Sequence, residues 1–124
     1  MITGIGIDTV HVKRIKRWYS NLKLMERFFH SEEIAAVTSR GSGAALSLAA
    51  RFAAKEAFGK ALGTGLSGII LKDIVVINKN NGKPEIQVYG SARTALEKSG
   101  ANTMHISLTH ENDSAIAMVV LERT

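Results

Sequence analysis

The fold of this chain is decided by the stretch RFAAKEAFGKALGTG, residues 51–65, which ends a helix that we expect to begin near Ala44. Its alanines and the neighbouring Leu46 and Leu48 favour helix, and no proline interrupts them. Gly63 is well placed as the left-handed residue that ends the helix. Three alanines four residues apart, at positions 53, 57 and 61, supply with Phe58 the side that packs against the rest of the protein.

Four charged side chains lie in the same helix. Glu56 and Lys60 share one face with Phe52, and Arg51 and Lys55 share the neighbouring face. Burial of a charge is costly without a partner, so charges in the expected most buried part of a helix indicate a functional site. The alternative is a surface Glu56–Lys60 pair in the favoured order, which stabilises a helix by about 0.2–0.5 kcal/mol.

The composition is that of a single folded domain, residues 1–124, with 45% hydrophobic and 22% charged residues. No apolar run approaches the ~20 residues of a membrane span, and the N-terminal residues lack the pattern of a signal peptide. There is no cysteine, which excludes disulfides and thiolate metal sites. We therefore expect a cytoplasmic protein without a membrane partner. The net charge of +5 favours an acidic partner: a nucleic acid, an acidic protein or a phosphorylated small molecule.

The residues from Ile2 to Asp8 alternate as in a strand, with Gly4 and Gly6 leaving one face nearly bare. Two glycines in a strand usually mark the close approach of another backbone or of a ligand. Asp8 ends this strand on the bare face, where it either belongs to a site or caps the helix that follows.

A helical pattern follows from Val10 to Phe29, broken around Ser20-Asn21. Its basic face favours a docking surface for an acidic partner. The basic residues concentrated there are Lys13, Arg14, Lys16 and Arg17. Ser31 is expected to cap a further short helix.

The glycines at positions 63, 65 and 68 formally match G-x-G-x-x-G. A dinucleotide-binding fingerprint needs a strand before it and a helix after it, whereas here the helix comes first. We reject a Rossmann fold and keep this loop as flexible backbone that can approach a phosphate.

The second half of the chain predicts strands at 69–77 and 84–89, joined by a turn with the hairpin signal Asn81-Gly82. A helix over 91–99, capped by Ser91, and strands at 104–109 and 115–121 follow. His105 and His110 are five residues apart and face opposite sides of one strand, so they cannot share a metal ion. This order predicts an α+β fold, with a mostly antiparallel sheet packed against helices.

Three separate motifs together resemble those of the holo-acyl-carrier-protein synthases, small phosphopantetheinyl transferases. Gly6-Ile-Asp8 followed by Arg14 is similar to their G-x-D-x5-R start. Phe52-Ala-Ala-Lys-Glu-Ala57 with Lys60-Ala61 is similar to F-x-x-K-E-A-x-x-K-A, and Ser107-Leu-Thr-His110 to S-x-[ST]-H. The run Asn81-Gly-Lys-Pro84 also resembles a common loop of the family, and the resemblance extends from Met1 to about Arg123. One departure is His30, which stands where the family usually has Thr.

The resemblance implies a phosphopantetheinyl transferase-like fold and a role in fatty acid biosynthesis. The family transfers the phosphopantetheine arm of coenzyme A to a serine of apo acyl carrier protein, releases adenosine 3′,5′-bisphosphate and requires Mg²⁺. It assigns Asp8 and Glu56 to the metal, a donor set that suits a hard cation, and Lys60 to the phosphates. The base that deprotonates the serine stays open among Glu56, Asp8 and a metal-bound water. Further candidates for binding coenzyme A are Arg51, Lys55, Gly63, Gly65 and His110.

Partners follow from the same resemblance. Acyl carrier protein is acidic, so Arg14, and by extension Arg17, are expected to belong to its docking surface. The family also implies a homotrimer with active sites between subunits. A nucleic-acid-binding domain is the alternative from charge alone, but Tyr89 is the only aromatic residue on a predicted strand, and base stacking needs more. A family member that only binds coenzyme A or carrier protein is the second alternative.

Overall fold

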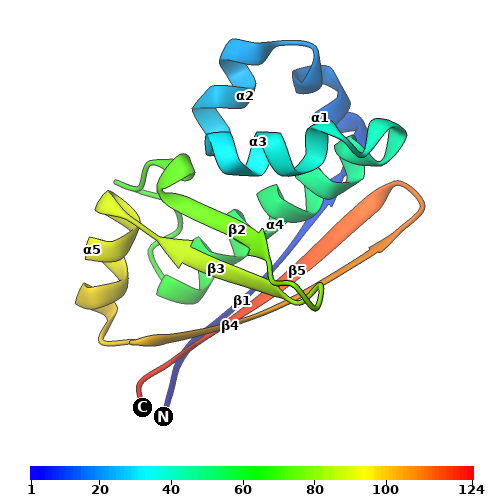
Figure 1. Ribbon diagram of the computed structural model, residues 1–124. Helices are drawn as coiled ribbons and strands as arrows, with labels where there is room; N and C mark the ends of the chain where they lie inside the picture. The colour runs from blue at the N-terminus through cyan, green and yellow to red at the C-terminus, as the bar shows by residue number, and fades with distance from the viewer.

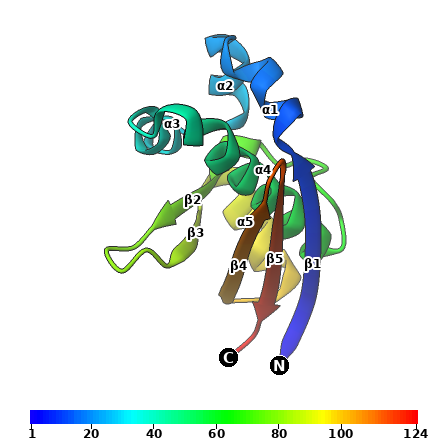
Figure 2. The same cartoon turned by 90° about the vertical axis from the view of Figure 1, so that its right-hand side faces the viewer.

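The computed structural model describes all residues from Met1 to Thr124 and shows a long helix held between two antiparallel sheets. The larger sheet has the order β1-β5-β4, and the smaller sheet is the β2–β3 hairpin. Helix α4 crosses between them (Figures 1 and 2). The two chain ends lie side by side, where the Met1 amino group donates to the Arg123 carbonyl at 2.9 Å. The predicted α+β fold is confirmed.

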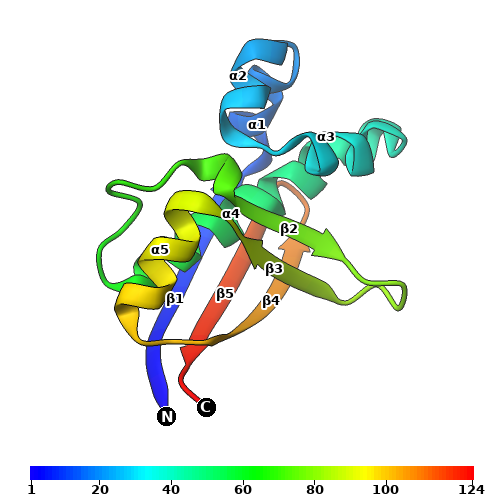
Figure 3. The same ribbon diagram turned by 60° about the vertical axis from the view of Figure 1, so that its left-hand side comes forward.

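The strands are β1 (Ile2–His11), β2 (Ile74–Asn78), β3 (Pro84–Val88), β4 (Thr103–Glu111) and β5 (Ser114–Glu122). The α-helices are α1 (Val12–Tyr19), α2 (Leu22–Phe28), α3 (Ser31–Thr38), α4 (Ala44–Leu62) and α5 (Gly90–Ser99), and two 3₁₀ turns are η1 (Gly41–Gly43) and η2 (Leu71–Asp73). Helices α1 to α3 gather at one end of α4, and α5 lies beside the loop that follows α4 (Figure 3).

Close contact between α4 and β1 sets the spacing of the layers. A Cβ atom on Gly6 would lie 2.0 Å from the Ala57 carbonyl oxygen, and one on Gly4 would lie 1.9 Å from the Ala61 carbonyl oxygen. Real Cβ atoms cannot approach so closely, so only glycine lets the strand rest on the helix backbone. The approach of a second backbone, predicted from the two glycines, is confirmed.

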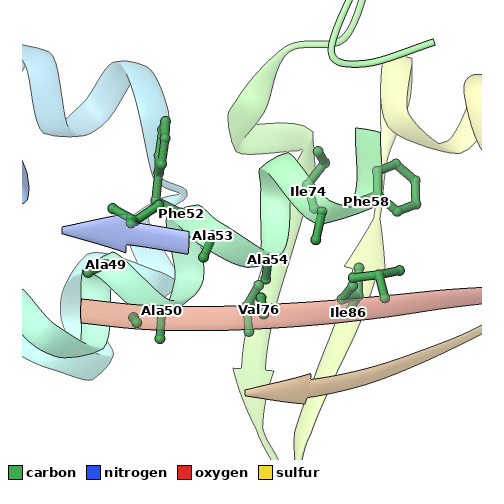
Figure 4. Packing of buried hydrophobic residues seen from close by; sticks show 14 of the residues in the cluster. Ala49, Ala50, Phe52, Ala53, Ala54, Phe58, Ile74, Val76 and Ile86 are labelled. Carbon is green, nitrogen blue, oxygen red and sulfur yellow. The ribbon is translucent and has the colours of Figure 1, made fainter. Parts of the chain in front are cut away.

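The core is built around the alanine-rich α4. Ala53, Ala54 and Ala57 are fully buried, as is Phe58, and Ala54 and Phe58 lie toward the side chains of β2 and β3 (Figure 4). On the other side of the helix, β5 presents alternate small or apolar residues that are fully buried: Ala115, Ala117, Val119 and Leu121. Small side chains on both surfaces allow the layers to approach closely and still pack without voids.

The structure corrects several boundaries and caps. The strand predicted at 69–77 begins only at Ile74, because η2 precedes it. Helix α3 is capped by His30, whose Nδ1 accepts from the Glu32 N–H, and not by Ser31. The Ser91 N–H donates to the Asp73 carboxylate, so Asp73 takes the capping role that Ser91 was expected to fill.

Asp8 does not act as a helix cap. Strand β1 continues past it to His11, which immediately precedes α1. The interpretation of Asp8 as a capping residue is therefore wrong, and its side chain is available for another role. No helix in the structure combines the length and the apolar character needed to cross a bilayer.

We predict that Gly6→Ala destabilises the protein by about 3 kcal/mol, because its Cβ would overlap main-chain atoms of α4 that cannot yield separately. Urea unfolding followed by circular dichroism measures the change. Gly43→Ala is the matched control, since Gly43 has an ordinary φ of −82° and the nearest atom to an added Cβ is 3.9 Å away. Equal stability of the two variants would contradict the close-contact account.

Candidate active site

Asp8, Glu56 and Lys60 come together at the edge where β1 leaves α4. Asp8 lies two residues beyond the Gly6 contact, on the same face of the strand, so its carboxylate is brought against the helix. Lys60 Nζ donates to Asp8 Oδ1 at 2.9 Å and to the Ile7 carbonyl oxygen at 3.0 Å. The Asp8 side chain is 18% exposed and that of Lys60 is 53% exposed. The cluster is thus open to solvent on its Lys60 side.

Glu56 completes the pair of carboxylates. Partial burial raises the pKa of Glu56 above its usual range, and the negative charge of Asp8 raises this pKa further, while Arg14 and Lys60 oppose the shift. Of the two carboxylates, Asp8 is the one that forms an ion pair. Two carboxylates that disfavour each other's charge favour a cation between them.

The donor set fits a magnesium ion. Mg²⁺ is commonly bound by one or two carboxylates, and substrate phosphates and water complete its octahedron. The chain has no group of three or more histidine, cysteine or acidic side chains placed to hold a metal by themselves, at this site or elsewhere. Asp8 and Glu56 would therefore hold such an ion, and the remaining ligands would come from substrate and solvent.

Arg14 lies beside this cluster at the junction of α1 and α4. Its Cζ atom is 5.3 Å from the ring centroid of Trp18 and 5.1 Å from that of Phe52. Such placement over aromatic faces holds the guanidinium by cation–π attraction. Arg14 therefore lies between the basic face of α1 and Glu56. Arg17 is exposed on that face and forms no ion pair with an acidic residue.

The structure corrects the predicted role of Lys55 most clearly. Its side chain is completely buried, and its ammonium donates to Glu33 Oε1 at 2.6 Å, to the Ile74 carbonyl at 2.6 Å and to the Leu71 carbonyl at 3.0 Å. Burial lowers the pKa of Lys55, and the Glu33 carboxylate opposes this shift. With all three donors used inside the protein, Lys55 is a structural cation, and its assignment to a phosphate is wrong.

Glu33 is the buried ion-pair partner of Lys55, and it was not predicted from the sequence. Its Oε1 also accepts from the His30 N–H at 3.0 Å, and its Oε2 accepts from the Val76 N–H at 3.2 Å. One signal was present in the sequence, since Glu33 stands three residues after the residue that caps α3, the spacing of a capping box. The long-range link to Lys55 had no local signal.

Arg51 is held by protein partners of a different kind. One terminal nitrogen donates to the Ser47 hydroxyl, and the other donates to Asn78 Oδ1 at 3.0 Å. Burial lowers the pKa of Arg51, and its buried Nε has no hydrogen-bond partner. The guanidinium lies at the end of β2, next to the hairpin turn, and its role in binding coenzyme A stays a prediction.

The glycine loop after α4 has the left-handed backbone that favours glycine. Gly63, Gly65 and Gly68 have φ values of 84°, 65° and 76°, and no atom lies within 4 Å of an added Cβ on any of them. The loop and α5 enclose a surface cavity of about 600 Å³ whose walls include Leu62, Thr64 and Ser67. The backbone here can be approached from solvent, one turn beyond Lys60.

His110 is not brought to Asp8 within one chain. It lies near the end of β4, opposite Ala115 of β5, which in turn pairs with Val10 of β1. A full strand therefore separates His110 from β1, a distance of about 10 Å at ordinary strand spacing. If His110 and Asp8 act at one site, either the ligand spans this separation or the two residues come from different copies of the chain.

Comparison with known proteins gives a consistent result. Residues 4–119 match the model of the 4′-phosphopantetheinyl transferase superfamily. The holo-[acyl-carrier-protein] synthase of Treponema denticola is 55% identical over 98% of this chain and 99% of its own. The crystal structure of the Neisseria meningitidis synthase has a TM-score of 0.87 at 35% identity and covers 99% of this chain and 100% of its own.

A second solved structure adds a ligand. The holo-(acyl-carrier-protein) synthase of Bacillus anthracis, described in complex with CoA (3′,5′-ADP), has a TM-score of 0.83 at 36% identity. The similarity covers 100% of this chain and 99% of that one.

We predict that Lys55→Met destabilises the protein by about 3–5 kcal/mol, because it leaves Glu33 buried without its counter-ion. Adding Glu33→Gln should recover part of this loss, since the neutral amide no longer needs that counter-ion. Urea unfolding of both single variants and of the double variant gives the coupling energy. Lys98→Met, on the exposed face of α5, controls for loss of a lysine. Strictly additive losses would mean that the two side chains do not act as a pair.

Proposed function

The chain belongs to the 4′-phosphopantetheinyl transferase superfamily and transfers 4′-phosphopantetheine from coenzyme A to apo acyl carrier protein, and we propose that Asp8 and Glu56 hold the Mg²⁺ ion of this reaction. The observation that carries the proposal is the paired, partly buried carboxylates beside Lys60. When bound, the cation neutralises the pyrophosphate of coenzyme A and polarises the attacked phosphorus.

The reaction exchanges one phosphorus–oxygen bond for another. The serine oxygen of the carrier protein bonds to the phosphorus that bears the pantetheine arm. The bond from this phosphorus to the bridging oxygen breaks, and adenosine 3′,5′-bisphosphate leaves. The serine proton passes to a base, and the carboxylates of Asp8 and Glu56 are the groups of this chain placed beside Lys60 to accept it. Lys60, flexible and half-exposed, can meet the negative charge that develops on the leaving phosphate.

The basic face of α1 is the proposed docking surface for the carrier protein. Lys13, Lys16 and Arg17 are exposed on it, and none is paired with an acidic residue of this chain. Unpaired positive charges steer an acidic partner and make its binding sensitive to salt. Arg14 lies where this surface meets Glu56, so it would act nearest to the incoming serine.

We propose a homotrimer with active sites between subunits. The outer face of the larger sheet presents apolar side chains: Ile5 and Ile7 are 64% and 58% exposed, and Ile116 and Met118 are 36% and 39% exposed. A contiguous apolar patch of this kind usually marks an interaction surface.

The decisive measurement of function is a mass spectrum of apo acyl carrier protein after incubation with this protein, coenzyme A and Mg²⁺. We expect the mass of one phosphopantetheine group to be added, and EDTA to prevent the addition. Glu56→Ala should lower the rate about a hundredfold or more, since it removes a cation ligand. Glu97→Ala, on the exposed face of α5, is the control.

Each outcome has a distinct meaning. Normal turnover by a folded Glu56→Ala variant would contradict the metal site. No addition by the wild type, with a carrier protein known to be competent and with coenzyme A bound, would mean that the protein only binds its ligands.

We predict that Ile7→Lys disrupts the trimer and removes most of the transferase activity, because a charge on the apolar outer face opposes burial. Light scattering after size exclusion should give three times the 13.4 kDa of one chain for the wild type and a lower mass for the variant. Ile70→Lys is the matched control, with 56% exposure at the start of η2. A monomeric wild type with full activity would exclude interfacial sites.

A further inference from the structure

Lys60 and the proposed metal ion would both bind the Asp8 carboxylate. Lys60 Nζ lies 2.9 Å from Asp8 Oδ1 and is fixed a second time by the Ile7 carbonyl at 3.0 Å. A divalent ion held by the same carboxylate would lie close to the ammonium, and like charges at close range repel.

Glu56 does not draw Lys60 away from Asp8. It is the second proposed ligand, but Lys60 pairs with Asp8 instead, although Lys60 follows Glu56 by one helical turn. The Lys60 side chain is 53% exposed and has a flexible stem, so it can turn toward solvent without moving the backbone. The pyrophosphate of coenzyme A carries two negative charges and would offer the ammonium a partner outside the carboxylate pair.

We propose that Lys60 exchanges Asp8 for a substrate phosphate, and that this exchange makes the divalent cation and coenzyme A bind cooperatively. Without coenzyme A, the ammonium competes with the cation for Asp8. With coenzyme A, the pyrophosphate draws the ammonium away and frees the Asp8 carboxylate for the cation. Each ligand thereby tightens the binding of the other by the same factor, as linkage requires. This inference rests on the proposed metal site and adds to it a coupling carried by one side chain.

Cation affinity can be measured without turnover, by titrating the protein with Mn²⁺ as a stand-in for Mg²⁺ and following free Mn²⁺ by electron paramagnetic resonance. The titration is done with and without coenzyme A, and a protein-free series corrects for Mn²⁺ bound by coenzyme A itself. No carrier protein is added, so no reaction occurs. Isothermal titration of coenzyme A with and without Mn²⁺ gives the reciprocal measurement.

The informative variant is Lys60→Met, which keeps the length of the side chain and removes its charge. Without coenzyme A, we expect this variant to bind Mn²⁺ about two- to fivefold more tightly than the wild type, the range for a half-exposed ion pair. The enhancement of Mn²⁺ binding by coenzyme A should fall by a similar factor. Lys60→Arg keeps the cation and should behave like the wild type. Lys23→Met, exposed on α2, controls for the change in net charge.

The outcomes separate this inference from the proposed function. Weaker or unchanged Mn²⁺ binding by Lys60→Met, with binding still abolished by Glu56→Gln, would overturn the exchange and leave the metal site intact. Equal Mn²⁺ binding by the wild type and Glu56→Gln would overturn the metal site and the exchange together. An unchanged enhancement by coenzyme A in Lys60→Met would also overturn the exchange, because the coupling would then come from the phosphates alone.

Discussion

The contact of β1 with the backbone of α4 is the constraint on which the other features depend. Gly4 and Gly6 meet main-chain atoms of the helix, so no side chain lies between strand and helix at these positions. This contact sets the height of the helix above the sheet, and the small alanine side chains of β5 fit the narrow space that is left. It also places Asp8, the next residue on that face, beside a helix that carries Glu56 and Lys60. The site is thus a consequence of how closely two backbones pack.

A second constraint fixes the rotation of the same helix. Lys55 directly precedes Glu56, and its buried ammonium is bound to α3 through Glu33 and to the backbone before β2. Neighbouring residues on a helix point about 100° apart. Holding Lys55 toward α3 and β2 therefore turns Glu56 toward Asp8. The two adjacent charges therefore differ in position: Lys55 holds the helix in place, and Glu56 faces the Asp8–Lys60 cluster, where we propose that it binds a cation.

Much of this could be predicted from the sequence because the signals were local. The limits of α4, its glycine stop, the hairpin turns and the bare face of β1 depend on residues within a few positions of each other. Asp8, Glu56 and Lys60 were found as one cluster because their family motifs are specific. The pairing of Lys55 with Glu33 was not predicted, because Glu33 lies 22 residues away and no local pattern links the two. The prediction that Ser91 caps α5 was wrong for the same reason. The capping carboxylate belongs to Asp73, 18 residues away in the sequence.

The charges of α4 show how stability and function are divided along one helix. Lys55 is buried with an opposite charge and several hydrogen bonds, so its desolvation is compensated within the fold. Glu56 is partly buried beside a like charge, and its raised pKa means that the folded state holds its proton more tightly than the unfolded chain does. As the pH rises through the unfolded and then the folded pKa, ionisation of Glu56 therefore costs stability. The cation that we propose between Asp8 and Glu56 would recover that cost, so the unfavourable pair would add to the binding energy of the cation.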